Sequence, residues 1–139
     1  MNDAGDLEWI NDFVGVPYRD NGRGRNGWDC WGLVMAVYRE RLGVELPDWQ
    51  WQEPFGISQK FRAFGGALES VDLGQLACRI EQPEPWALAL AHHRAAPHHV
   101  GVVAGLDSVL HARRYGGTVY EPVARFAHGQ GVTLWKWRA

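Results

Sequence analysis

A cysteine stands where a glycine-rich loop meets an apolar segment, in the stretch Trp28-Asp29-Cys30-Trp31-Gly32. Aspartate is a preferred N-cap, because its carboxylate accepts hydrogen bonds from the unpaired amides of a first helical turn. The sequence therefore predicts Cys30 in a first turn, where the helix dipole favours the thiolate that attacks carbonyl carbons. Gly32 is expected to keep side-chain bulk away from the sulfur. A buried apolar cysteine without chemistry is the alternative, and position alone leaves both open.

Histidines could supply the base for that thiol. Four of the six are close together in the chain, and two follow further on: His92, His93, His98, His99, His111 and His128. A hairpin of residues 99–103 and 107–111, closed by residues 104–106, predicts His99 directly across from His111, with Cβ atoms about 5 Å apart. His98 would then face the opposite side of the sheet. Two sheet-face histidines without chemistry are the alternative.

A thiol at a helix N-terminus, a histidine on a strand and a second polar residue beside it form a cysteine-nucleophile constellation. The sequence predicts no metal site, because no histidine pair has the i, i+4 spacing of a helical zinc site. Cys30 and Cys78 lack metal-ligand spacing too, so both are expected to be reduced.

Composition limits the class of protein. The 139 residues, 46% of them hydrophobic, suit one domain spanning residues 1–139. A net charge of -2 argues against a nucleic-acid partner. The acidic start of the chain has no apolar export segment, and the longest apolar run, residues 86–91, cannot span a bilayer. We therefore expect a product made in the cytoplasm without a signal peptide and without membrane insertion.

The elements that would position these residues come as helices first and strands later, which predicts an α+β fold. A short amphipathic helix over Leu7–Val14 should end at Gly15, and a buried central helix should run from about Asp29 to Leu42 and end at Gly43. We expect a loop over residues 48–54 and a helix over Ile57–Leu68. Strands of an antiparallel sheet are predicted over residues 86–91, 99–104, 108–112, 118–123 and 132–137.

The loop before Asp29 contains Gly22–Gly27, which reads G-x-G-x-x-G. The segment before it is polar and holds a proline, whereas a dinucleotide site requires a buried strand there, so the motif does not predict a nucleotide site. Its arginines, Arg19, Arg23 and Arg25, either keep the loop solvated or bind substrate carboxylates.

Four ordered blocks, within a match from about residue 12 to the end, resemble the signature segments of NlpC-type papain-like cysteine peptidases: Gly15-Val-Pro-Tyr18, Asp29-Cys-Trp-Gly-Leu-Val34, His99-Val-Gly-Val102 and Leu110-His-Ala112. The resemblance implies a papain-like fold with Cys30 as nucleophile. It also implies His99 as general base and then acid, His111 as the residue that orients it, and Tyr18 near the oxyanion site. No cofactor is implied.

Residues beside the nucleophile are assigned to the substrate or oxyanion region, namely Asp29 and Trp31. Packing is the alternative role for Trp31 and for Trp28. One departure from the family is Pro85-Trp86, where many relatives have a Gly-Asp pair before the first strand. We expect it to affect the turn and not the chemistry.

The family usually cleaves stem peptides of bacterial peptidoglycan, commonly next to D-glutamate. The Gly22–Gly27 loop resembles members associated with phage and prophage tails. We therefore expect a stem-peptide hydrolase that acts through a thioester, is built into a phage-like tail and contacts tail-tip proteins. The alternatives are a tail docking module without turnover, and a thiol amidase or acyltransferase acting on a substrate outside the cell wall.

Overall fold

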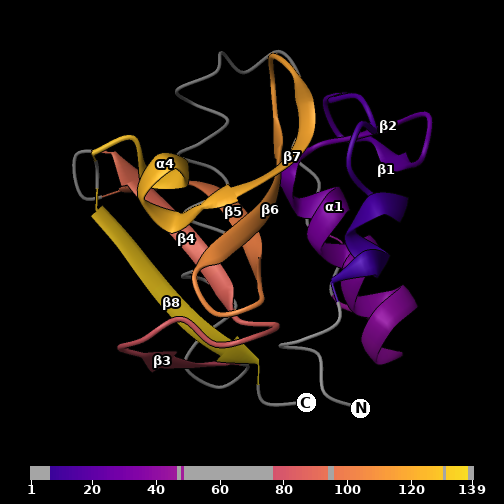
Figure 1. Ribbon diagram of the computed structural model, residues 1–139. Helices are drawn as coiled ribbons and strands as arrows, with labels where there is room; N and C mark the ends of the chain where they lie inside the picture. Colours follow the sequence, from indigo (N-terminus) through magenta and orange to yellow (C-terminus); the bar gives the residue numbers. More distant parts are fainter. Residues whose placement is uncertain (1–6, 47, 49–76, 94–95, 130, 138–139) are drawn as a thin grey trace.

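A computed structural model describes residues 7–46, 48, 77–93, 96–129 and 131–137. Helical elements come first and a sheet follows, so the α+β prediction is confirmed (Figure 1). The predicted loop over residues 49–54 and helix Ile57–Leu68 lie outside the described residues. The elements are η1 (Glu8–Asp12), β1 (Arg23–Gly24), β2 (Gly27–Trp28), α1 (Cys30–Val37), η2 (Tyr38–Leu42), β3 (Ala77–Ile80), β4 (Leu88–His93), β5 (Ala96–Ala104), β6 (Ser108–Arg113), β7 (Gly117–Pro122), α4 (Val123–Ala127) and β8 (Gly131–Trp137).

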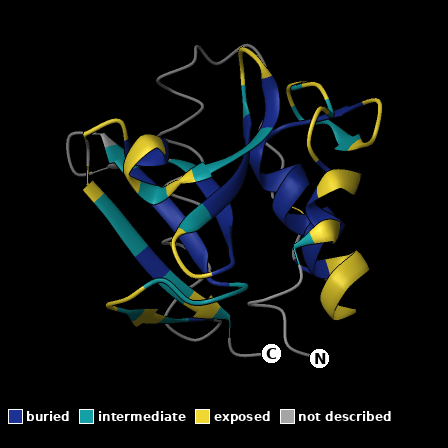
Figure 2. Ribbon diagram, viewed as in Figure 1, coloured by how far each residue is buried: buried dark blue, intermediate teal, exposed yellow. Residues whose placement is uncertain are grey.

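The central helix α1 begins at Cys30 after the N-cap Asp29, as predicted, and all eight of its residues are buried. A helix that is apolar on every side is stable only inside a core. It continues into the π-helical turn η2, which is largely exposed (Figure 2), and ends at Gly43 in the left-handed conformation (φ 68°). None of the helices in the described part of the chain has the length and apolar character needed to cross a bilayer.

Six antiparallel strands form the main sheet, in the order β3-β8-β4-β5-β6-β7. The five predicted strands are present, with ends shifted by a few residues. Strands β4 to β7 form a meander, but β8 returns to pair with β4 and separates it from the unpredicted strand β3. The predicted strand over residues 118–123 also ends early, because Val123 begins the short helix α4.

Each face of the sheet carries its own apolar cluster, and Figure 1 shows α1 and α4 on opposite sides. Leu88, Val100 and Leu110 belong to the cluster that contains α1. Ala89, Val103 and Val109 belong to the second cluster, which Phe126 of α4 completes. Because side chains alternate along a strand, His99 lies on the face opposite to Val100, under α4.

The N-terminal segment differs from its prediction. The helix predicted over Leu7–Val14 is a single 3-10 turn, η1, followed by Gly15 with a φ of 96°. A turn of this length presents few positions to the core, so Ile10 and Phe13 are buried while Val14 is 44% exposed.

The loop predicted before Asp29 contains the small hairpin β1-β2, which packs against the start of α1. A Cβ atom on Gly32 would lie 2.3 Å from the carbonyl oxygen of Gly22. The expectation that Gly32 clears space around the sulfur is therefore wrong, because its missing side chain lets the loop approach the helix.

Pro85 and Trp86 lie in the turn before β4. Trp86 has a left-handed backbone (φ 73°), which costs an L-residue about 1–2 kcal/mol. The Trp86 N–H donates to Val103 O at 2.8 Å, and its ring stacks on Trp9 with centroids 5.0 Å apart. These contacts hold the strained residue in place before β4.

Replacing Gly32 tests the contact between loop and helix. We expect Gly32→Ala to lower the free energy of unfolding by about 1–3 kcal/mol, since the new methyl group meets a backbone oxygen. Gly24→Ala is the control, because a Cβ at Gly24 has no atom within 4 Å. Urea denaturation of both variants measures the difference, and equal stabilities would contradict the close approach.

Candidate active site

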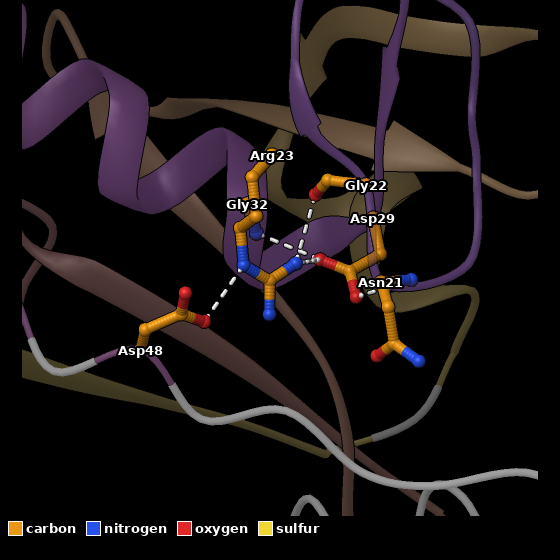
Figure 3. A network of polar contacts seen from close by, with 6 residues as sticks. All are labelled: Asn21, Gly22, Arg23, Asp29, Gly32 and Asp48. Carbon is orange, nitrogen blue, oxygen red and sulfur yellow. Dashed lines mark hydrogen bonds and ion pairs between the residues drawn. The ribbon is translucent and has the colours of Figure 1, made fainter.

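The Asp29 carboxylate joins the loop to the start of α1 and so fixes Cys30 (Figure 3). Asp29 is 1% exposed, and its Oδ1 accepts from Gly32 N–H at 2.7 Å and from Arg23 Nη1 at 2.8 Å. Its Oδ2 accepts from the N–H of Asn21 at 3.2 Å. Arg23 also donates to Asp48 at 2.9 Å. The carboxylate predicted as an N-cap is therefore also the centre of a polar network.

The Cys30 side chain lies in the first turn of α1 and is nearly buried, at 6% exposure. The N–H of Val100, the residue after His99, donates to its sulfur, as does the N–H of Trp31. Burial, and then the Asp29 carboxylate, raise the pKa of the thiol to about 12, and the two N–H groups and Arg23 offset only part of this rise. The direction of this shift is opposite to the one predicted from the helix dipole, because burial and Asp29 favour the thiol over the thiolate.

His99 and His111 are in direct contact, with His99 Nε2 2.8 Å from His111 Nδ1. The predicted register is nevertheless wrong by two residues, because Val102 pairs with Leu110 around a turn at residues 105–107. His111 therefore faces Gly101, where a Cβ atom would lie 2.9 Å from the His111 Cβ. A shift of two residues preserves the face of the sheet, so the histidines still meet, diagonally across Gly101.

A carboxylate that sequence reasoning missed completes the pair. Glu121 Oε1 lies 2.9 Å from His111 Nε2, and the His111 side chain is 2% exposed. Burial lowers the pKa of His111, and Glu121 offsets part of that decrease. The predicted strand over residues 118–123 contains Glu121, and pairing it with the predicted strand over residues 108–112 would have placed Glu121 near His111, because β6 and β7 pair Val109 with Glu121.

Tyr18 lies close enough to the thiol for the two groups to interact electrostatically. Burial raises the pKa of Tyr18, and the negative charges of Cys30, as a thiolate, and of Asp29 raise it further. The guanidinium of Arg114 lies 5.3 Å from the centre of the Tyr18 ring and pairs with Asp20 at 3.0 Å. The tyrosine that the family resemblance assigned to the oxyanion region is thus near Cys30.

The tryptophans beside Cys30 have packing roles. Trp31 is 0% exposed and Trp28 is 1% exposed, and the Trp28 indole donates to Thr118 Oγ1 at 2.8 Å. Assigning the Trp31 side chain to the substrate region is therefore wrong, because a ring without exposed surface cannot contact substrate.

Two loop arginines are engaged within the protein. Arg25 makes two hydrogen bonds to Glu40, at 2.7 and 3.0 Å, and lies over the Phe13 ring. Arg23 belongs to the Asp29 network. One interpretation of the sequence was that these arginines bind substrate carboxylates. Both instead pair with carboxylates of the protein itself.

Among the remaining histidines, the structure describes the side chains of His92 and His128, and His128 lies near enough to His111 to lower its pKa. His92 Nε2 lies 2.8 Å from Thr133 Oγ1. The His98 side chain lies outside what the structure describes, so its predicted orientation stays a prediction. Within the described residues, no group of three or more His, Cys, Asp or Glu side chains could hold a metal ion.

A pocket of about 570 Å³ lies at the far end of the central helix, lined by Tyr38, Trp86 and Trp137 among others. It contains neither the thiol nor an imidazole. Chemistry is therefore expected at the start of α1, and this pocket is no part of the candidate active site.

A cysteine at a buried helix start, packed against a strand that carries a histidine, is the arrangement of papain-like folds. The NlpC/P60 family model matches residues 15–132, and the chain belongs to this family. It is 26% identical over 113 residues to the murein DD-endopeptidase MepS/murein LD-carboxypeptidase of Escherichia coli K12, covering 81% of this chain and 50% of the relative. The chain thus spans about half the length of that relative.

Solved structures share the fold. The NlpC/p60 domain of the peptidoglycan hydrolase SagA superimposes with a TM-score of 0.62 at 20% identity, covering 96% of this chain and 98% of the domain. An NlpC/P60 family protein from Bacillus cereus gives a TM-score of 0.60 at 17% identity, covering 89% of this chain and 36% of that protein.

Alkylation of Cys30 tests its protonation state. Both cysteines are free, as expected, so Cys78→Ser leaves Cys30 as the single thiol. We expect its iodoacetamide rate to be low at pH 7 and to rise about tenfold per pH unit toward its pKa of about 12, because the thiolate reacts. A rate that levels off below pH 8 would show a thiolate at neutral pH.

Proposed function

We propose that this chain is a cysteine peptidase that hydrolyses peptide bonds in peptidoglycan stem peptides. The observation that carries the proposal is the hydrogen-bonded pair of His99 on β5 and His111 on β6. Val100, the residue after His99, donates its N–H to the Cys30 sulfur. Membership of a family that includes a peptidoglycan hydrolase and a murein endopeptidase supports the substrate class.

The proposed reaction begins from a neutral thiol, because burial disfavours the thiolate. His99 takes the S–H proton as the sulfur bonds to the substrate carbonyl carbon, and the carbonyl π electrons move to its oxygen. When the C–N bond breaks, the imidazolium protonates the leaving amine and a thioester remains. Water, deprotonated by His99, then attacks the thioester and releases the carboxylic acid product and the thiol.

The developing oxyanion requires hydrogen-bond donors that stay in position. We assign this role to the backbone N–H of Cys30, at the start of α1, and to the Tyr18 hydroxyl. Its raised pKa keeps the Tyr18 hydroxyl protonated, so it can donate throughout the neutral range. Asp29 acts indirectly, by holding the start of that helix.

We further propose that a phage-like tail carries the domain to the cell wall. The resemblance of the Gly22–Gly27 loop to tail-associated members of the family supports this proposal. A tail docking module without turnover, and a thiol amidase or acyltransferase on a different substrate, are the competing functions.

Defined stem peptides test the proposed activity. We expect the purified protein to cleave at least one of them, with products identified by mass spectrometry, and Cys30→Ala to release none because it lacks the nucleophile. Absence of cleavage by the wild-type protein, together with stoichiometric binding to tail proteins, would support the docking module instead.

Histidine variants test the assigned roles in the same assay. We expect His99→Ala to lower kcat by about 10²- to 10⁴-fold through loss of the base, with His98→Ala as the matched control. His111→Ala should leave weak activity, and His111→Asn should retain more, since an amide still hydrogen-bonds the ring. Equal losses in His98→Ala and His99→Ala would refute the assignment of the base.

A further inference from the structure

Glu121 ends a continuous line of hydrogen bonds that begins at His99. Two contacts make up the line, His99 Nε2 to His111 Nδ1 at 2.8 Å and His111 Nε2 to Glu121 Oε1 at 2.9 Å. The glutamate side chain is 11% exposed, and the His111 side chain between the two is 2% exposed. Solvent therefore has little access to the groups that decide where the ring protons lie.

The chemistry of each atom fixes the direction of every hydrogen bond in this line. A carboxylate only accepts, so His111 must carry its proton on Nε2. Burial lowers the pKa of His111, which favours the neutral ring, and a neutral ring protonated at Nε2 has its lone pair at Nδ1. That lone pair accepts from His99 Nε2–H, so the lone pair of neutral His99 lies on Nδ1.

We propose that Glu121 is a positioning residue that sets the tautomers of both histidines and thereby makes Nδ1 of His99 the acceptor of the Cys30 proton. The proposal rests on the proposed function and extends it, because the reaction needs a base that acts through one defined nitrogen. The opposite tautomer of His99 would carry a proton on Nδ1 and could not deprotonate the thiol.

The turn from β7 into α4 supplies both the carboxylate and the cover above the rings. Phe126 stacks on His99 with centroids 5.4 Å apart and meets the edge of His111 at 4.9 Å. An apolar cover strengthens hydrogen bonds beneath it, because water cannot compete for the same donors and acceptors. Glu121 thus accepts the hydrogen bond from His111, while Phe126 covers both imidazole rings.

Other charged groups act on His111 in the opposite sense. Arg113 on β6 and His128 after α4 lower its pKa, whereas Glu121 raises it. Glu121 therefore opposes the effects of Arg113 and His128 on His111, and its charge also stabilises the imidazolium that forms when His99 takes a proton. The proton taken from the thiol stays on His99.

Two variants of Glu121 separate its acceptor role from its charge. We expect Glu121→Leu to lower kcat on a stem peptide by about 10- to 100-fold with little change in KM, because the tautomers are no longer fixed. Glu121→Gln retains an acceptor oxygen and should lose less activity. It should also shift the rise of kcat with pH to lower pH, since removing a negative charge lowers the pKa of the histidines. Glu45→Gln is the control, because Glu45 is 72% exposed and pairs with Arg39.

Histidine ¹⁵N NMR of the full chain provides a readout that does not depend on activity. We expect both His99 and His111 to be Nε2–H tautomers in the neutral wild-type protein and in Glu121→Gln, and mixed tautomers in Glu121→Leu. An Nδ1–H tautomer at His99 in the wild type, or unchanged tautomers in Glu121→Leu, would overturn the proposal. If no stem peptide is cleaved, the proposed function fails while the NMR spectra still decide the role of Glu121.

Discussion

The contact between the Asp29 carboxylate and the first turn of α1 determines how the rest of the site is arranged. One buried group caps the helix, pairs with Arg23 and accepts from the backbone of Asn21. An N-cap contributes about 1 kcal/mol to helix stability, and loss of this carboxylate would also remove the partner of Arg23, whose side chain is 17% exposed. Because the loop and the helix meet at this carboxylate, its position fixes where Cys30 lies.

One face of the sheet packs against α1, and the other face carries the two histidines. Val100 and Leu110 pack toward α1 and hold the helix, while His99 and His111 point to the other face and meet Phe126. The Cys30 thiol lies at the start of α1 and accepts the N–H of Val100, so it is next to β5 at the residue that follows His99. Because neighbouring side chains on β5 point to opposite faces, Val100 supports α1 while His99 supplies the proposed base.

Periodicity and local capping made much of this arrangement predictable from the sequence. Asp29 before Cys30 and Gly43 after the helix are local capping signals, so the predicted start and end of the helical segment agree with the structure. The histidine contact was predicted despite a wrong register, because an error of two residues leaves each side chain on its face. Contacts set by tertiary structure were not predicted, such as the insertion of β8 between β3 and β4.

Glu121 shows why the remainder of the site was missed. A glutamate before a proline has no distinctive sequence signal, and its meaning depends on the pairing of β6 with β7. The pKa of Cys30 was missed for a related reason, because helix position was considered without the burial and the adjacent carboxylate that oppose the dipole. Both errors come from charges that local sequence does not bring together.

The balance of charge around Cys30 explains why the proposed base, His99, is supported by His111 and Glu121. The carboxylate that anchors the helix also disfavours a thiolate next to it, and Arg23 compensates only part of that effect. The helix N-terminus therefore cannot ionise the thiol alone, and the proton must leave during the attack on the substrate. A base for this step must be neutral beforehand and its cation stabilised afterwards. His111 and Glu121 support His99 in this step, since burial favours the neutral His111 ring that accepts the His99 N–H, and the Glu121 carboxylate favours the cation once it forms on His99.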